Sequence, residues 1–237
     1  MQAEKIAIWR EIERALRAEI EQGRYRPGDK LPTEAALATR FSVNRHTVRR
    51  ALAAIEADGL THARRGAGVF VAAKPTTYPL GRRVRFHQNL IAAGRTPAKE
   101  ILRLETVAAA PREAEALRIE EGAPVHIWEG IALADGAPVT LFQSWFCATR
   151  FPDLKDDLEG TKSVTAALRR AGVLDYTRAS TRLTAEAAGA MHALRLRLSQ
   201  GAPLLRAVAV NVDPDGRPIE YGRTWFAGER VTLTVEG

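Results

Sequence analysis

The sequence predicts an α+β protein with two parts: a small helical unit that ends in a β-hairpin, and then a mostly antiparallel sheet covered by helices. Two observations predict this class. Near the N-terminus, apolar residues recur at intervals of three and four, which indicates helices. In the remainder, a pattern of helix end, strand, Asp-Gly turn and strand occurs twice, which indicates a repeated β-hairpin unit.

The first predicted helix has one apolar face and is followed by a second, shorter helix. Gly23 supplies a stop for the first helix, and the turn-rich residues 27–32 follow it. Thr33 is suited to cap the second helix, and Glu34 is a carboxylate favoured in a first helical turn. The apolar face of the first helix consists of Trp9, Ile12, Leu16 and Ile20.

A third predicted helix begins after Asn44, an N-cap residue, and is closed by Gly59. Its apolar face carries Val48, Leu52 and Ile55, and its opposite face carries Arg45, His46 and Arg49. In the sequence no carboxylate lies among these cations, and a helix in the DNA major groove needs such fork-shaped donors. We therefore predict a DNA-binding helix-turn-helix, with a merely solvated basic face as the alternative.

Residues 60–71 are typical of a strand, a basic glycine-containing tip and a second strand. A tip with Arg64, Arg65 and Gly66 can approach phosphates or the minor groove, as the wing of a winged helix-turn-helix does. The alternative is a glycine-rich phosphate loop. The Gly-x-x-x-x-Gly-Lys-Ser/Thr motif is absent, so a nucleotide site is disfavoured.

The basic charge of the chain is concentrated in this first part. Residues 1–75 hold 14 Lys and Arg against 9 Asp and Glu, and residues 76–237 hold 21 against 19. With a pI of about 10.0, the chain is expected to bind an anionic partner through its N-terminal third. Cys147 is the only cysteine, which excludes an internal disulfide and argues against a zinc site. No apolar stretch reaches the ~20 residues of a membrane span, so we expect a cytoplasmic protein.

The domain boundary is predicted near Lys74, where prolines interrupt the periodicity. The expected domains are residues 1–73, a linker at 74–79, and residues 80–237.

The second domain is predicted to contain two copies of one unit, offset by 79 to 80 residues. Gly122 and Gly201, the turns at Gly136 and Gly216, and then Trp145 and Trp225 correspond to each other. Two related halves meet about a pseudo-twofold axis, and the cleft between them is a natural small-molecule pocket. The tryptophans are interpreted as hairpin core. The other expected elements are strands at 101–107, 177–184 and 231–235, and helices starting at Pro111 and spanning 163–171 and 185–197.

Nothing in this domain identifies an enzyme. His87, His126 and His192 are scattered through different predicted elements. We find no nucleophile with a base, no metal-ligand cluster and no cofactor fingerprint. A binding role without a metal or cofactor is therefore favoured.

Residues 28–38, 43–52 and 58–60 resemble the GntR family of bacterial transcription regulators. This resemblance implies that Thr33 and Glu34 start a helix lying over the DNA backbone, and that Arg65 and Gly66 form the wing tip. It assigns DNA contacts to Arg45, His46, Thr47 and Arg49. It also implies a homodimer that binds palindromic double-stranded operator DNA.

Residues 78–82, 85–90 and 94, the turn at 134–138 and the segment 219–221 look like the effector-binding UTRA domain of the HutC branch, whose fold is similar to chorismate lyase. Within that branch, the sequence most resembles PhnF-type regulators of phosphonate metabolism. The implied function is a repressor that responds to a small anionic effector, such as a phosphonate or a phosphate ester.

The resemblance also implies where the effector binds. The backbone at Arg85, Phe86 and His87 corresponds to an anion site, and Tyr221 lies in the terminal motif. Sugar-responsive relatives carry arginines where this chain has Glu129 and Ile131, and often a Glu where it has Phe142, which argues against an aminosugar phosphate. In relatives, such arginines clamp the anionic group of the effector. Three other arginines of this chain are candidate replacements for that clamp: Arg178, Arg182 and Arg223.

Three alternatives remain open at this stage. In the first, the effector is another organic acid or a sugar phosphate. In the second, the second domain is a chorismate-lyase-like enzyme fused to a DNA-binding head. In the third, the protein is an architectural DNA binder without sequence preference.

Overall fold

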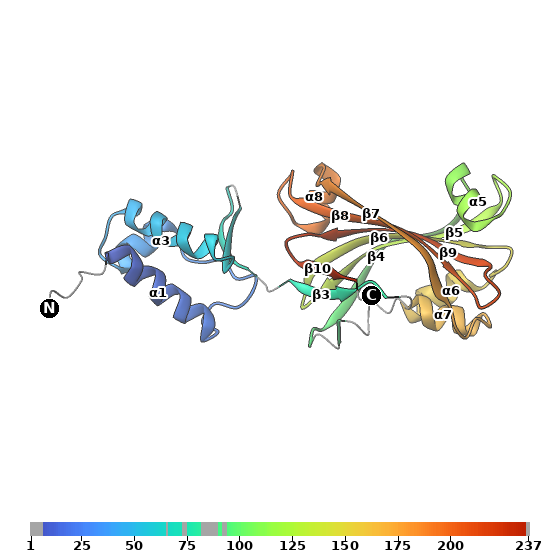
Figure 1. Cartoon of the computed structure of the whole chain (residues 1–237), viewed down its shortest axis with the longest axis horizontal. Coiled ribbons are helices and arrows are strands. Elements are labelled where there is room, and N and C mark those ends of the chain that lie inside the picture. The colour runs from blue at the N-terminus through green and yellow to red at the C-terminus, as the bar shows by residue number, and fades with distance from the viewer. Residues whose placement is uncertain (1–6, 65, 73–74, 82–89, 92–93, 236–237) are drawn as a thin grey trace. The chain divides into compact units, whose positions relative to one another are not determined.

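The computed structural model describes residues 7–64, 66–72, 75–81, 90–91 and 94–235. The chain divides into two compact units, Met1–Lys74 and Pro75–Gly237 (Figure 1). Within the described ranges, no helix is both long enough and apolar enough to cross a membrane.

The first unit consists of three helices and a β-hairpin. The helices are α1 (Ile8–Glu21), α2 (Glu34–Arg40) and α3 (Arg45–Ala57), and the hairpin strands are β1 (Thr61–Arg64) and β2 (Gly68–Val71). Their shared core contains the fully buried side chains of Leu16, Leu37, Val48 and Ile55. The apolar spacing in the sequence therefore predicted the faces that pack together.

Two polar side chains determine where α2 and α3 begin. The Thr33 hydroxyl accepts a hydrogen bond from the Ala36 amide at 3.2 Å, and the Asn44 side-chain oxygen accepts one from the Thr47 amide at 2.9 Å. Each cap satisfies an amide that has no partner within its helix. The cap at Asn44 places Arg45 at the first position of α3.

The hairpin β1–β2 is antiparallel, with Thr61 opposite Val71 and Arg64 opposite Gly68. Gly66 and Gly68 both have positive φ angles, of 75° and 111°, which a side chain would strain. At Gly68 a Cβ atom would also lie 2.7 Å from the Lys30 side chain. The predicted strand, glycine tip and strand are thus present, and Arg65 lies outside the described residues.

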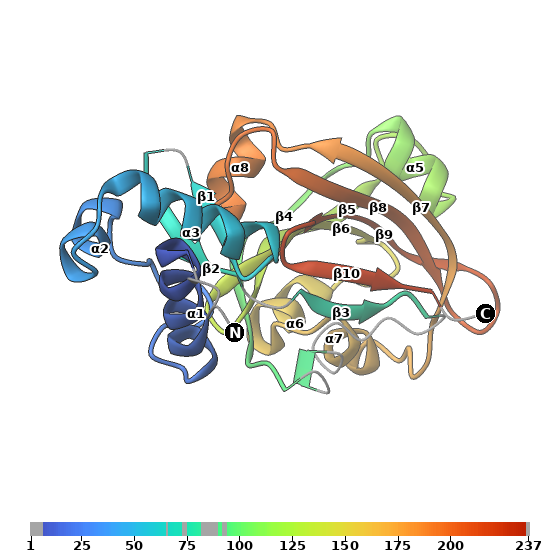
Figure 2. The same ribbon diagram turned by 60° about the vertical axis from the view of Figure 1, so that its left-hand side comes forward.

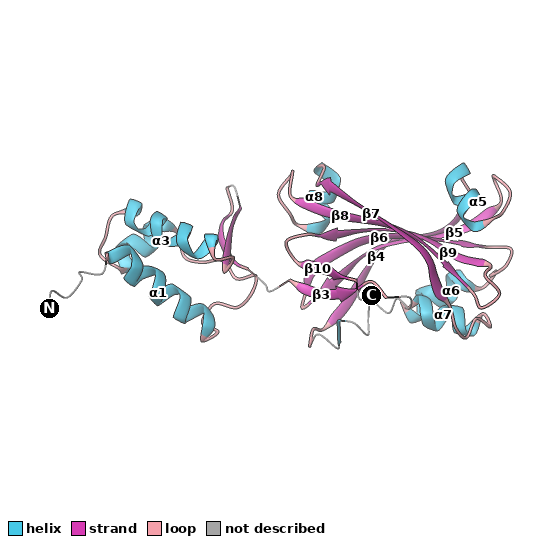
Figure 3. Cartoon of the chain, viewed as in Figure 1, coloured by secondary structure: helices cyan, strands magenta, loops and turns pink. Residues whose placement is uncertain are grey.

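The second unit is built on a six-stranded antiparallel sheet with the strand order β4-β5-β6-β9-β8-β7 (Figures 1 and 3). The chain order is β4 (Pro97–Ala108), α5 (Pro111–Leu117), β5 (Pro124–Ala134), β6 (Ala137–Cys147), α6 (Leu154–Thr161), α7 (Val164–Arg170), β7 (Thr177–Ala187), α8 (Ala190–Leu196), β8 (Pro203–Val212) and β9 (Pro218–Ala227).

The predicted repeat appears as two halves, β4-α5-β5-β6 and β7-α8-β8-β9, which meet where β6 pairs with β9. In that pairing Trp145 lies opposite Tyr221, and Trp225 lies opposite Leu141, which is the reciprocal arrangement that a pseudo-twofold axis produces. The halves also agree in how their helices end. The C-cap residues of α5 and α8, Arg118 and Arg197, both adopt the left-handed conformation.

Different elements cover the two faces of the sheet. Helices α5 and α8 lie on one face, and α6, α7 and the strands β3 (Thr76–Pro79) and β10 (Val231–Thr234) lie on the other (Figures 1 and 2). Trp145 packs with residues of α5, and Trp225 packs with residues of α8. Both tryptophans are buried, as expected for hairpin core, and Cys147 at the end of β6 is half-buried.

Part of the expected linker is a strand. Thr76–Pro79 forms β3, which pairs in parallel with β10, and its side chains alternate between buried and exposed. The alternation of buried and exposed residues covers only four positions and is flanked by prolines, so the sequence did not indicate a strand there. A strand at this position requires β10 as its partner, which comes from the far end of the chain.

The boundaries of the later elements also differ from the prediction. Residues 185–187 were expected to be helical, but they continue β7 and pair with β8, and the helix begins only at Ala190. Pairing in the sheet outweighs the intrinsic helix preference of the two alanines there. Helix α6 was not predicted.

Candidate functional site

The exposed face of α3 carries the basic residues that the sequence singled out. Arg45, His46 and Arg49 are exposed, and Val48 on the opposite face is completely buried. The Thr47 hydroxyl is used locally, since it donates a 2.9 Å hydrogen bond to the Asn44 side chain. The first turns of α3 thus present cationic donors from a rigid, capped start.

A carboxylate from α2 lies against this basic face, which the sequence did not reveal. Glu34 accepts two hydrogen bonds from Arg49, one from Nε at 3.0 Å and one from Nη2 at 2.7 Å. The hydrogen bond from Arg49 is the largest influence lowering the pKa of Glu34, and the charges of Arg45 and His46 lower it further. The two residues are 15 positions apart, so only the fold brings them together.

Thr33 and Gly66 lie on opposite sides of a groove of about 300 Å³ between the start of α2 and the wing. Lys30 also lines this groove, and sequence reasoning did not select it. Arg50, by contrast, stacks over Trp9 at 4.6 Å, which directs its guanidinium toward α1.

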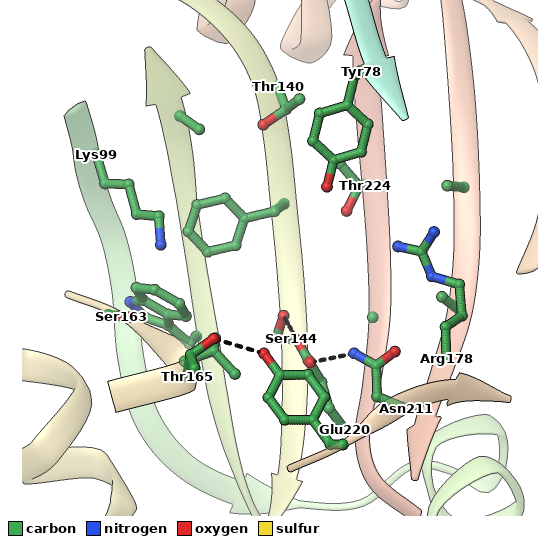
Figure 4. Close-up of a pocket in the computed structure, with 18 of the residues that line it drawn as sticks. Tyr78, Lys99, Thr140, Ser144, Ser163, Thr165, Arg178, Asn211, Glu220 and Thr224 are labelled. Carbon is green, nitrogen blue, oxygen red and sulfur yellow. Dashed lines mark hydrogen bonds between the residues drawn. The ribbon is translucent and has the colours of Figure 1, made fainter. Parts of the chain in front are cut away.

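The second unit contains a cavity of about 380 Å³ on the sheet face that α7 and β3 cover (Figure 4). Both halves of the sheet contribute to its wall. One side is closed by the first turn of α7, where the hydroxyls of Thr165 and Tyr176 are hydrogen-bonded at 2.9 Å. Its aromatic lining consists of Tyr78, Trp128, Phe142, Tyr176 and Phe226.

Two partly buried cations occupy equivalent positions in the two halves. Lys99 on β4 pairs in register with Ala132, and Arg178 on β7 pairs in register with Asn211. The same repeat offset relates Lys99 to Arg178 and Ala132 to Asn211, and all four residues line the cavity. Figure 4 shows the two cations reaching in from opposite sides.

Burial disfavours the charged form of both groups. It lowers the pKa of Lys99 to about 8, against the opposing influence of the Glu220 carboxylate. It also lowers the pKa of Arg178, whose charge is supported by Tyr78 and Glu220. Among the residues that the structure describes, Arg178 Nε and Nη1 have no hydrogen-bond partner. Such buried donors are costly unless a ligand, water or another residue satisfies them.

One carboxylate lies between the two cations. Glu220 is buried and accepts hydrogen bonds from the Ser144 hydroxyl and the Asn211 amide, each at 2.7 Å (Figure 4). The side-chain oxygen of Asn211 is buried and has no partner in the described part of the chain. The centre of the cavity therefore offers hydrogen-bond acceptors, and its ends offer cationic donors.

Of the four predicted effector residues that the structure describes, only Arg178 lines this cavity. Arg182 is exposed on β7 and does not line the cavity. Tyr221 and Arg223 lie on the other face of the sheet, since Arg223 donates to Tyr221 at 3.0 Å and to Glu113 of α5 at 2.7 Å. The remaining three candidates, Arg85, Phe86 and His87, lie outside the described residues.

Glu129 and Ile131 lie away from the cavity, contrary to the prediction that they stand at the positions of an effector clamp. Ile131 packs with α8 on the opposite face, and Glu129 is hydrogen-bonded to Gln143 at 2.8 Å. Neither residue lines the cavity, whereas the adjacent Ala132 and Phe142 do. Because side chains alternate between the faces of a strand, an error of one position selects the wrong face. The missed residue Lys99 could have been found by applying the repeat offset to Arg178.

Comparison with known protein families agrees with this two-unit arrangement. Residues 9–71 match the model of bacterial regulatory proteins of the gntR family, and residues 92–232 match the UTRA domain. The chain belongs to the GntR family. This GntR protein is thus a DNA-binding transcription regulator whose UTRA domain takes a small-molecule effector.

Three relatives support the assignment along the whole chain. An uncharacterized HTH-type transcriptional regulator of Rhizobium meliloti (strain 1021) is 39% identical over 98% of this chain and 95% of its own. A protein of Escherichia coli (strain K12) named "Probable transcriptional regulator PhnF" is 34% identical, covering 96% and 94%. The crystal structure of PhnF from Mycobacterium smegmatis superposes with a TM-score of 0.67 at 28% identity, covering 98% and 99%. These GntR relatives are regulators and not enzymes, which argues against a catalytic second domain.

Proposed function

We propose that the protein is a cytoplasmic, homodimeric repressor of genes for the use of phosphonates or related phosphorus compounds. A small anion of this class binds in the UTRA cavity and changes the affinity for a palindromic operator. The observation that carries the proposal is Arg178, which lines the cavity and whose buried Nε and Nη1 are left without a described partner. A phosphonate or phosphate group supplies the acceptors that such a guanidinium needs.

In this proposal the first unit reads the operator. Two copies of α3 lie in successive major grooves, because twofold protein symmetry requires twofold operator symmetry. The start of α2, at Thr33 and Glu34, lies over the backbone, and the wing at Arg65 and Gly66 contacts phosphates. The base-reading residues are Arg45, His46, Thr47 and Arg49.

Strand β3 provides a route by which the effector acts on DNA binding. Tyr78 lines the cavity and lies only a few residues after the end of the first unit. Its side chain is buried, packs on Phe226 at 5.5 Å between ring centres, and interacts with Arg178. An effector held by Arg178 therefore shifts the position of β3, and differential affinity for two positions is what a switch requires.

The proposal is tested by fluorescence anisotropy with the full chain and the DNA upstream of its own gene. Methylphosphonate, inorganic phosphate and glucose 6-phosphate are titrated into the protein–DNA complex. We expect at least one phosphorus compound to change operator affinity, and we expect Arg178→Met to abolish the response. Arg182→Met is the matched control on the same strand and should respond normally. Unchanged operator affinity at saturating concentrations of every compound would overturn the proposal.

A second candidate effector is a hydroxylated organic acid or a sugar phosphate. The acceptors at the centre of the cavity, Glu220 and the Asn211 side-chain oxygen, favour ligands that carry hydroxyl or amino groups. In the same titration, a response to glucose 6-phosphate without one to methylphosphonate would favour this candidate.

A further inference from the structure

The strands that line the UTRA cavity bring positive charge to two separate ends, and the exposed Arg169 of α7 is a third cation in the lining. Arg178 enters from β7 and Lys99 from β4, the two edge strands of the sheet. Lys99 donates to the Lys162 backbone carbonyl at 3.0 Å, and its ammonium lies 4.7 Å from the centre of the Trp128 ring. No carboxylate in the described ranges lies within ion-pair distance of Lys99. Its burial is therefore not explained by a salt bridge within those ranges.

The donors at the Lys99 end remain incompletely used. Trp128 Nε1 is buried and lacks a hydrogen-bond partner among the described side chains and backbone. The ammonium next to it makes one described hydrogen bond, although it has three protons to donate. This end can therefore accept an acidic group, just as the Arg178 end can.

The centre between the two ends disfavours an anion. Glu220 is fixed there by Ser144 and Asn211, and its charge acts on both Lys99 and Arg178. A single compact anion placed centrally would face this carboxylate, and placed at either end it would leave the other cation without a counter-charge. Hydroxyl or amino groups, by contrast, can donate to Glu220.

We propose that the effector is a two-ended anion, with one acidic group bound at Arg178, a second bound at Lys99, and a short linking chain that passes Glu220. This inference rests on the proposed function and specifies the chemical class of its effector. A phosphonate with a terminal carboxylate belongs to this class, and so does a dicarboxylate. A hydroxyl or amino substituent on the linking chain adds a donor for Glu220.

The test is isothermal titration calorimetry of the full chain with two matched series. The two-ended series is phosphonoacetate, 3-phosphonopropionate and 4-phosphonobutyrate, and the one-ended series is methyl-, ethyl- and propylphosphonate. We expect one member of the two-ended series to bind roughly tenfold more tightly than its one-ended match, the contribution of one charge-assisted hydrogen bond. Lys99→Met keeps the aliphatic stem and should remove this advantage, so that the two-ended compound binds no more tightly than its one-ended match. Arg178→Met should weaken both series.

Arg182→Met removes a charge from the same strand outside the cavity and should change neither series. Equal binding of the two series, or an equal effect of Lys99→Met and Arg182→Met, would overturn the two-ended effector. If one-ended phosphonates still alter operator binding in that case, the proposed function stands without it. If no member of either series binds and none alters operator affinity, both fail together.

Discussion

Glu34 and Arg49 form a bidentate ion pair that joins the start of α2 to the exposed face of α3, with contacts of 3.0 and 2.7 Å. Both side chains are substantially exposed, so the pair contributes little to folding stability. Its main effect is on geometry. A guanidinium held by two parallel hydrogen bonds loses less conformational freedom when it meets a base, which favours specific over non-specific binding.

Arg49→Ala should weaken operator binding by about 1–3 kcal/mol and flatten its salt dependence, because a base-reading guanidinium and one positive charge are lost. The measurement is operator affinity by fluorescence anisotropy at several salt concentrations. Arg14→Ala removes an equal charge from an exposed position on α1 and is the control. Equal affinities for Arg49→Ala and the wild type would refute the assigned groove face.

Glu34→Gln should strengthen non-specific DNA binding while lowering the specificity for the operator. Removing the carboxylate makes the DNA-facing surface more positive, so binding to scrambled DNA should strengthen. Arg49 loses its charged anchor, so the ratio of operator affinity to scrambled-DNA affinity should fall. Both affinities are measured in the same buffer. An unchanged ratio would show that the ion pair does not orient Arg49 for DNA.

The buried Glu19 should make the first unit sensitive to acid. Hydrogen bonds from Arg40 are the largest influence lowering its pKa from the ordinary value of 4.5. A lowered carboxyl pKa stabilises the fold above the unfolded value, and this contribution is lost as the pH falls through the folded value. Glu19→Gln should therefore cost about 1–3 kcal/mol at pH 7, and the difference from wild type in calorimetric unfolding should shrink below about pH 4.5. Glu21→Gln, an exposed neighbour, should show no such trend.

Lys99 should also make stability rise with pH, but in the alkaline range. Its pKa is about 8 in the folded protein, against 10.5 ordinarily. Between these values the unfolded chain holds a proton that the folded chain has released, so the stability of the wild type rises with pH. Relative to Lys99→Met, the wild type should gain up to about 3 kcal/mol across this window. Thermal unfolding of both proteins at intervals from pH 7 to 10.5 measures it, and parallel curves would mean that Lys99 is not buried as a cation.

The features of the fold and the site differ in how well the sequence predicts them. The helices of the first unit follow from local spacing and caps, and the repeat follows from two recurring turn motifs, so both were recognisable. The Glu34–Arg49 pair, the parallel pairing of β3 with β10, and the cavity depend on residues that are distant in the chain. Which face of the sheet a strand residue occupies was harder still to predict, because a shift of one residue moves a side chain such as Arg223 to the other face of the sheet.

Two glycines on the cavity side of the sheet should respond differently to an added methyl group. At Gly222 the nearest atoms to a new Cβ are 3.9 Å away, one of them Glu220 Oε1, so Gly222→Ala fits and projects into the cavity. At Gly130 the Cβ would lie 2.5 Å from the Glu100 carbonyl oxygen and 2.8 Å from the Phe142 ring. Because the carbonyl belongs to the neighbouring strand, Gly130→Ala must displace β4 or β5.

Gly130→Ala should therefore lower stability by about 1–3 kcal/mol, the usual cost of overpacking. Gly222→Ala should leave the melting temperature within a degree or two of wild type, yet weaken effector binding because the methyl group occupies space next to Glu220. Thermal unfolding and calorimetric titration of both variants test the pair. If Gly222→Ala binds the effector as tightly as wild type does, the ligand lies elsewhere and the cavity between Lys99 and Arg178 is not the effector site.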